Sequence, residues 1–420
     1  MFKKICFCFV ICALFGCSRI LPEKQKQNVY IFRPYEVQTF ENQEQSFNVA
    51  MLLPLSGKAS TYGKGLQNAA MMAIEDTNNQ NLEIRFYDTK STPTGALEAF
   101  HQAVANKAKL VLGPLTADEV SAVAPSAKRE SIPVISFSTS PQVLGNGVYT
   151  LGLLSEEQIK RIIDFSVEKG RKNIAVVLPD SASGLNMAKS AYDAALSSGA
   201  NITKIGFYEP STLEFSDLVK KMIATKDFDA VLIAETGSRL KAIAATFGYY
   251  DVAYPDVLFI GTSVWENTNL TKETTLYHGV YPSISRVHGD YFNKKYKDLF
   301  GELPNSLYAY AYDGVALASA LSTKDTNHLN EYITNADGYI GINGVFKINT
   351  DGTNAHRLEV VEITENGIKT VSPAEQRFSA EVYHMPTYAS RLPEIYGKNA
   401  DIVYHRLQPQ VTNTPYFNIF

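Results

Sequence analysis

The stretch GKASTYGKG, residues 57–65, resembles two loops that bind phosphate groups but departs from both. A P-loop places four residues between its two glycines and then Lys and Ser or Thr, whereas five residues separate Gly57 from Gly63 and a glycine follows the lysine. A dinucleotide-binding loop of the form GxGxxG would need a third glycine at the position of Asn68. The stretch therefore predicts no phosphate site and leaves open what this loop holds.

Side chains that carry out catalysis in other proteins are present here but are not grouped. The histidines are scattered, and no two are four residues apart as in a helical metal site. The stretch SASGLNM, residues 181–187, lacks the first glycine of a GxSxG nucleophile elbow. The acid pairs at 118–119 and 156–157 are typical of the first turn of a helix, where the positive dipole end favours carboxylates. We therefore predict no enzyme activity, no metal site and no cofactor.

Three loops at expected strand ends carry small polar side chains: Ser56 and Tyr62 after the first strand, Thr116 after the third, and Ser138 and Thr139 after the fourth. In open parallel sheets, ligands bind beyond the carboxyl ends of the strands. Hydroxyls and free N–H groups at a helix N-terminus can bind a carboxylate there. The alternative is that these hydroxyls only cap helices. Because three polar loops converge on one edge, we favour a binding cleft.

Apolar segments of strand length alternate with helical segments along most of the chain. Strands are expected at 49–55, 82–88, 109–113 and 132–137 and, after a cluster of glycines at 145–152, at 173–179, 201–208, 229–235 and 256–261. Continuous apolar strands separated by helices predict parallel sheets that are covered on both faces. The fold class is therefore α/β, with two doubly wound units in succession.

The C-terminal third contains three different sequence patterns in succession. A helix rich in small residues is expected within 303–322, and the alternation over 338–367 predicts short antiparallel strands joined by Asp-Gly and Asn-Gly turns. The residues from Gln376 onward are rich in Tyr and Pro, which predicts an extended or weakly ordered tail. The expected organisation is a signal peptide at 1–16, a tether at 17–46, lobe one at 47–147 plus 305–370, lobe two at 148–304 and a tail at 371–420.

The N-terminus has the pattern of an export signal. Two lysines precede an apolar core of twelve residues, which is shorter than the roughly 20 residues of a membrane span. The core ends in LFGC, which resembles a bacterial lipobox, in which Cys17 would carry lipid after removal of residues 1–16. The alternative is an ordinary signal peptide with an incidental Cys17. Ser18, which replaces the Asp that retains many lipoproteins in the inner membrane, implies an outer-membrane location by resemblance.

The positions of the cysteines and the net charge exclude further classes of protein. All four cysteines lie in the first 17 residues, so the mature chain would keep only Cys17 and could form no disulfide within its fold. The net charge is −4, and removal of Lys3 and Lys4 with the signal gives −6. A nucleic-acid-binding protein would usually show a basic patch, so the charge argues against one.

The order of these segments resembles the type I (leucine/isoleucine/valine-type) periplasmic binding proteins. MLLPLSGKASTYGKGLQNAAMMAIEDTN is similar to their first strand, loop and helix, and VLGPLTADEVSAVAPSAKRESIPVISFSTSP to their third and fourth strands. FGELPNSLYAYAYDGVALASAL and GINGVFKINTDGTNAHRLEVVEI are similar to their closing helix and final strands. The resemblance covers about residues 47–370. It implies two lobes joined by three hinge crossings, with the glycine-rich loop at the mouth of the cleft and Tyr62 covering a small ligand.

The resemblance also implies an amino-acid site, from which this chain departs. In the amino-acid binders of this family, lobe one holds the ligand carboxylate, and Thr139 matches one of those positions. An acid in lobe two holds the ligand ammonium, but the comparable residue here is Ser263, which cannot pair with a cation. Glu235 or Glu266 could substitute. Because an unpaired buried ammonium is costly and Phe137 is bulky, we expect only weak binding of free branched-chain amino acids.

One branch of the family resembles this chain more than the amino-acid binders do. The lipobox together with VLGPLTADEV, AETGSRLKAIAATFGYYD and FIGTSVWEN resembles the lipoprotein penicillin-binding protein activators. This resemblance implies a non-enzymatic, lipid-anchored periplasmic protein that docks to and activates a peptidoglycan synthase, a penicillin-binding protein. The alternative is a solute-binding protein that delivers an amino acid or a small polar solute to an ABC permease. The expected contact surfaces for a synthase are the tyrosine-rich stretch 246–257 and the tail, although the tyrosines could instead pack on the sheet.

Overall fold

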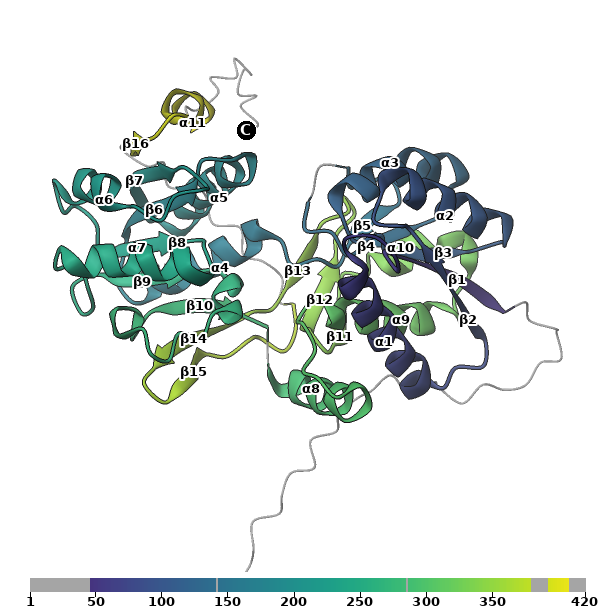
Figure 1. Ribbon diagram of the computed structural model, residues 1–420. Coiled ribbons are helices and arrows are strands. Elements are labelled where there is room, and N and C mark those ends of the chain that lie inside the picture. The colour runs from purple at the N-terminus through teal and green to yellow at the C-terminus, as the bar shows by residue number, and fades with distance from the viewer. Residues whose placement is uncertain (1–45, 141–142, 285, 379–391, 408–420) are drawn as a thin grey trace, which may run out of the picture.

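The computed structural model describes residues 46–140, 143–284, 286–378 and 392–407, which form two lobes, each built on its own sheet (Figure 1). Cys17 and the expected tether up to residue 45 lie outside the described residues. Among the described helices, none combines the length and the apolar character that crossing a membrane requires.

Lobe one contains a five-stranded parallel sheet of order β2-β1-β3-β4-β5. Its central strands read as unbroken apolar runs because helices cover both faces. Residues of β1 alternate between two hydrophobic cores, with Met51 and Leu53 on one side and Ala50 and Leu52 on the other. The strands are β1 Phe47–Leu53, β2 Leu82–Asp88, β3 Leu110–Leu112, β4 Val134–Ser136 and β5 Val148–Thr150.

The helices of lobe one come from both ends of the chain. Helices α2 and α3 cover one face, while α1 and α9 pack against each other on the opposite side. A small antiparallel sheet, β11-β12-β13, follows α10 near the other lobe (Figure 1). The elements are α1 Ser60–Thr77, α2 Pro93–Ala105, α3 Ala117–Glu130, α8 Arg286–Phe300, α9 Tyr308–Leu321, η3 Thr326–His328, α10 Leu329–Ile333, β11 Tyr339–Gly341, β12 Gly344–Ile348 and β13 Asn354–His356.

Lobe two is built on an eight-stranded sheet of order β15-β14-β10-β9-β8-β6-β7-β16. Its strands run parallel except β14 and β15, which form an antiparallel ladder on β10. The strands are β6 Asn173–Pro179, β7 Asn201–Tyr208, β8 Ala230–Ile233, β9 Leu258–Gly261, β10 Val280–Ser283, β14 Glu359–Thr364, β15 Gly367–Ser372 and β16 Glu394–Tyr396. The helices are α4 Ser155–Glu168, α5 Ala182–Ser198, α6 Ser216–Ile223, α7 Gly237–Tyr249, η1 Ser263–Asn267, η2 Thr274–Leu276 and α11 Ala400–Leu407.

The chain passes between the lobes at three places: between β5 and α4, between β10 and α8, and between β13 and β14. Side chains brace the first of these crossings. The Asn354 Nδ2 donates to the carbonyls of Thr150 and Gly152 at 2.9 and 2.8 Å, and the Leu153 N–H donates to the Tyr310 hydroxyl at 3.0 Å. The first crossing is therefore tied to the C-terminal elements of lobe one.

The lobes differ in extent from those expected from the sequence. The strand β5 joins the sheet of lobe one, and α8 packs into the core of lobe one through Phe292 and Tyr296. Conversely, β14 and β15 extend the sheet of lobe two, although residues 359–370 were expected in lobe one. A pattern of alternating residues predicts strands but does not indicate which of two sheet edges they join, which explains this error.

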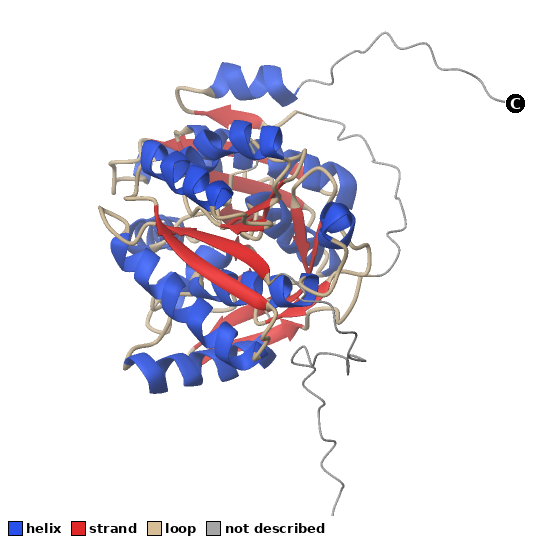
Figure 2. Cartoon of the chain, turned by 90° about the vertical axis from the view of Figure 1, so that its right-hand side faces the viewer, coloured by secondary structure: helices blue, strands red, loops and turns tan. Residues whose placement is uncertain are grey.

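The expectation of a tail without helix or strand from Gln376 is wrong in part. Strand β16 adds to the edge of the sheet beside β7, and α11 packs on α5 through Val403 and Leu407 (Figures 1 and 2). Both elements are short, which explains why the surrounding Tyr and Pro content hid them. The remaining tail residues, 379–391 and 408–420, lie outside the described residues.

Candidate functional site

The glycine-rich loop allows close packing of lobe one. A Cβ at Gly63 would lie 2.1 Å from the Pro54 carbonyl oxygen, and one at Gly65 would lie 2.1 Å from the Tyr308 ring. These two glycines therefore let α1 approach the end of β1 and the N-terminus of α9. The glycines of this loop are explained by close packing against Pro54 and Tyr308, without a bound phosphate.

A pocket of about 290 Å³, here called the cleft pocket, lies between the lobes. Lobe one contributes the loop after β4, and lobe two contributes the N-termini of α4 and α5, of which α5 follows β6 directly. The pocket therefore lies beyond the carboxyl ends of parallel strands, where open α/β sheets bind ligands. Its lining residues are Thr139, Ser140, Ser155, Glu156, Ala182, Ser183, Asn186 and Met187.

The lining of the cleft pocket is rich in hydrogen-bonding groups. Hydroxyls come from both lobes, an amide from Asn186 and a carboxylate from Glu156. Ser181 caps α5 by accepting from the Gly184 N–H at 3.2 Å, which fixes the first turn of the helix. This combination suits a small polar ligand that both donates and accepts hydrogen bonds.

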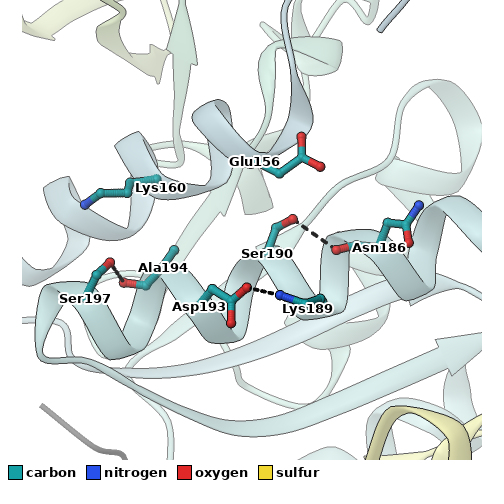
Figure 3. Close-up of a pocket in the computed structure, with 8 residues that line it drawn as sticks. All are labelled: Glu156, Lys160, Asn186, Lys189, Ser190, Asp193, Ala194 and Ser197. Atoms are coloured by element: carbon teal, nitrogen blue, oxygen red, sulfur yellow. Dashed lines mark hydrogen bonds and ion pairs between the residues drawn. The ribbon is translucent and has the colours of Figure 1, made fainter. Parts of the chain in front are cut away.

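A groove between α4 and α5 shares Glu156 and Asn186 with the lining of the cleft pocket (Figure 3). The groove has a volume of about 520 Å³ and is lined by Glu156, Lys160, Asn186, Lys189, Ser190, Asp193, Ala194 and Ser197. Lys189 pairs with Asp193, and Lys160 pairs with Asp164 at 2.9 Å. Since its lysines already have acidic partners one turn away, the groove offers no unpaired cation to an anionic ligand among these residues.

The structure brings only one of the seven predicted cleft residues, Thr139, into the lining of the cleft pocket. Ser138 is next to it but is buried, and its hydroxyl accepts from the Ser140 N–H at 3.1 Å. Tyr62 is 47 % exposed on α1. The Ser263 N–H donates to the Gln158 Oε1 at 2.8 Å, which ties η1 to α4.

Two predicted residues have structural partners. Thr116 forms a capping box at the start of α3, in which its hydroxyl donates to the Glu119 Oε2 at 2.9 Å and accepts from the Glu119 N–H. The Ser56 hydroxyl donates to the Asp88 Oδ2 at 2.6 Å, and its N–H donates to the other oxygen. For Thr116, the capping interpretation left open by the sequence accounts for the observed contacts.

Glu235 is buried at the end of β8 and already has a cationic partner. Its carboxylate accepts from the Arg239 Nε at 2.9 Å, from the Thr236 N–H at 2.9 Å and from the Tyr208 hydroxyl. Burial opposes ionisation, but these hydrogen bonds outweigh it and hold the pKa of Glu235 below its ordinary value. Because Arg239 balances its charge, Glu235 is a poor partner for a ligand ammonium.

We predict that Glu235→Ala lowers the free energy of unfolding by about 1–3 kcal/mol, because the buried Tyr208 hydroxyl loses its acceptor. Chemical denaturation measures the change. The matched variant Arg239→Ala should cost less, since its side chain is 40 % exposed. Equal losses in the two variants would contradict this account of the cluster.

Sequence reasoning missed the lobe-two half of the cleft pocket. Ser155, Glu156 and Ser183 lie in the first turns of α4 and α5, and Asn186 lies in the second turn of α5. Small polar residues follow β6 just as they follow the strands of lobe one. The stretch SASGLNM, which lacks the first glycine of a nucleophile elbow, instead begins α5 with Ser181 as its cap. Among the described residues, no cluster of three His, Cys, Asp or Glu side chains could hold a metal ion.

A model of the periplasmic binding protein family matches residues 46–368. The chain belongs to the periplasmic binding protein family. This is a family of binding proteins and not of enzymes, which agrees with the prediction made from the scattered catalytic side chains. The type I fold with two lobes on parallel sheets is likewise confirmed.

Individual comparisons agree on the fold. The crystal structure of a putative branched-chain amino acid ABC transporter from Rhodospirillum rubrum superposes with a TM-score of 0.70 at 16 % identity, covering 78 % of this chain and 100 % of that one. An uncharacterized protein of Rickettsia prowazekii is 20 % identical over 355 residues, 79 % of this chain and 90 % of its own. The penicillin-binding protein activator LpoA of Glaesserella parasuis is 28 % identical over 149 residues, 35 % of this chain but 25 % of its own.

Proposed function

We propose that this protein binds a small polar solute in the cleft between its lobes and delivers it to an ABC permease. The observation that carries the proposal is the cleft pocket, whose hydroxyl, amide and carboxylate groups come from both lobes. A ligand held by both lobes stabilises the arrangement in which they approach each other, and this is how a hinged protein reports its occupancy. The structural likeness to the Rhodospirillum rubrum protein supports the proposal.

A thermal-shift screen of amino acids, aromatic carboxylates and small polyols tests the proposal. We expect at least one class to raise the melting temperature of the wild-type protein, because binding to the folded state alone stabilises it. The double variant Thr139→Ala/Asn186→Ala should lose that shift, while Thr323→Ala, which removes an exposed hydroxyl that does not line the pocket, should keep it. A shift that survives in the double variant would place the solute elsewhere.

A second candidate function is activation of a peptidoglycan synthase, which the similarity to LpoA favours. One surface feature supports it: Tyr249 is 81 % exposed and Tyr254 48 %, whereas Tyr250 packs partly against the core. Exposed aromatic side chains are enriched at the centres of protein interfaces. A pull-down from envelope extract with the wild type and with Tyr249→Ala tests this function. A synthase captured equally by both proteins would exclude this surface as the contact. If the wild type captures no synthase, the function itself is excluded.

The lipid anchor is a separate proposal that rests on the lipobox pattern ending at Cys17. Metabolic labelling with a fatty-acid probe should tag the wild type and fail to tag Cys17→Ser. The expected effect is complete loss of label, because the thiol is the attachment point. A label that persists in Cys17→Ser, or a wild type that takes up no label, would contradict lipidation of Cys17.

A further inference from the structure

Strand β2 leaves one edge of the lobe-one sheet open. It pairs with β1 along its whole length, from Leu82 beside Phe47 to Asp88 beside Leu53. On its other side no strand of the described residues joins it, because β2 stands at the end of the sheet order (Figure 1). In lobe two, by contrast, β16 adds to the sheet beside β7. An unpaired strand edge presents a row of N–H and C=O groups that can pair with a further strand.

The residues of β2 do little to prevent such pairing. Proteins usually block a free edge with a very short strand, a proline, a lysine or a β-bulge. The strand LEIRFYD, residues 82–88, has seven residues and contains neither proline nor lysine. Its register with β1 continues without a shift. The edge is therefore long and regular enough to accept another strand.

The backbone of β2 directs the polar groups of alternate residues toward this edge. At the start of the strand the Asn81 carbonyl accepts from the Phe47 N–H at 2.7 Å. At its end the Thr89 N–H donates to the Leu53 carbonyl at 2.9 Å. Both of these odd-numbered residues of the β2 segment thus face β1, and successive residues of a strand direct their N–H and C=O groups to opposite sides. The groups of the even-numbered residues, Ile84 among them, therefore point away from β1.

The charged side chains of β2 are complementary to a second copy of themselves. Glu83 and Arg85 form an ion pair at 2.6 Å and remain 41 and 47 % exposed. The Glu83 carboxylate also accepts from the Ser46 hydroxyl at 3.2 Å. In an antiparallel pair of β2 strands, a two-fold axis through Ile84 places Glu83 of each copy opposite Arg85 of the other. An axis through Glu83 or Arg85 would instead place like charges opposite each other, which destabilises a strand pair.

The opposite face of β2 is apolar and only partly buried. Three side chains there pack against the main core of lobe one without being covered completely: Leu82, Ile84 and Phe86. With the axis at Ile84, the two Ile84 side chains meet each other and Leu82 meets Phe86, and apolar pairs of this kind stabilise neighbouring strands. One register therefore suits the backbone groups, the charges and the apolar side chains together.

We propose that β2 pairs in antiparallel fashion with β2 of a second copy of this chain, across a two-fold axis at Ile84. Each Ile84 exchanges N–H and C=O hydrogen bonds with Ile84 of the other copy, and each Phe86 N–H donates to the Leu82 carbonyl of the other copy. The contact is isologous, since both copies use the same edge. It involves lobe one alone and does not require a solute in the cleft pocket.

Sedimentation equilibrium tests association in the chain expressed from Ser18, which keeps every described residue. We expect the average mass to rise from the monomer value toward twice that value between about 1 µM and about 200 µM protein. A wild type that stays monomeric over this range overturns the proposal. If removal of residues 18–45 then produces a dimer, the N-terminal residues of the chain occupy the edge in place of a second copy.

Charge reversal tests the register. Glu83→Arg and Arg85→Glu should each weaken self-association by at least about 10-fold, because two opposed pairs become repulsive. An equimolar mixture of the two variants should dimerise again, since each copy then places its charges opposite those of the other sign. Asp298→Arg, which reverses an exposed acid of α8 outside β2, should leave association unchanged. Single variants that associate like the wild type, or a mixture that stays monomeric, would overturn the proposed pairing.

Hydrogen exchange locates the contact in the backbone. At dimer-forming concentrations the Ile84 and Phe86 amides should exchange at least about 10-fold more slowly than in dilute protein, because their N–H groups gain acceptors. The Arg85 N–H already faces β1 and serves as the internal control. Association without slower exchange at Ile84 and Phe86 would place the interface elsewhere and contradict the proposal.

Discussion

Replacing Gly63 by alanine should lower the free energy of unfolding by about 3 kcal/mol or more. The added Cβ would lie 2.1 Å from the Pro54 carbonyl oxygen and 2.5 Å from its carbonyl carbon. These atoms are backbone at the end of β1, so no side-chain rotation relieves the overlap. The helix α1 would have to move away from the sheet, which would also weaken its packing against α9. Chemical denaturation measures the loss.

Gly289→Ala is the matched control for this prediction. Gly289 is also helical, in α8, and a Cβ there would meet nothing within 4 Å. Because alanine favours a helix over glycine by about 1 kcal/mol, this variant should be neutral or slightly more stable. If Gly63→Ala were as stable as Gly289→Ala, close packing would not explain the glycine-rich loop, and a ligand role for the loop would have to be reconsidered.

The second large effect is on the pH dependence of stability and involves Asp313. Burial within lobe one raises the pKa of Asp313 to about 6 from an ordinary value near 3.8, and the N–H groups of Ile342 and Asn343 and the nearby His356 only partly offset the burial. Between these two values the folded chain binds more protons at this site than the unfolded chain. The contribution of Asp313 to stability is therefore fully present below about pH 4 and is lost as the pH rises through 6.

Asp313→Asn isolates that contribution because it cannot titrate. The shift is about two pKa units, and each unit is worth about 1.36 kcal/mol, so the stability difference between wild type and variant should fall by about 3 kcal/mol from pH 4 to pH 7. Denaturation of both proteins across this range gives the difference directly. Parallel stability curves would show that Asp313 has an ordinary pKa in the folded protein.

Sequence patterns predicted the sheets well where the strands are long. The strands at 82–88, 173–179 and 201–208 have the expected bounds, since each is seven or eight residues long. Of these, β6 is a buried and nearly continuous apolar run, whereas β2 lies at the sheet edge and is only partly buried. The strand β5 has only three residues and follows a glycine cluster, so it gave no comparable signal. The choice of sheet edge for β14, β15 and β16 depends on tertiary contacts that no local pattern contains.

The candidate site was less predictable than the fold. Of the expected cleft residues, Thr139 lines the cleft pocket beyond the strand ends. Residue types alone do not show which polar side chains already have a hydrogen-bonding or ionic partner within the chain. Thr116 is held by Glu119, Ser56 by Asp88 and Glu235 by Arg239. Asp88 lies on β2, 32 residues beyond Ser56, so the fold sets that contact, whereas the partners of Thr116 and Glu235 lie only three and four residues further along the chain.

The distance between the lobes across the cleft, followed during titration with a solute from the thermal-shift screen, tests the central claim most directly. Spin labels at Lys58→Cys in lobe one and Glu209→Cys in lobe two would report it in a chain expressed from Ser18, because all four native cysteines lie in the first 17 residues. The account predicts that the distance shortens on binding and that the Thr139→Ala/Asn186→Ala variant shows no change. A solute that binds while the distance stays constant, or a screen in which no solute binds, would contradict solute capture in the cleft.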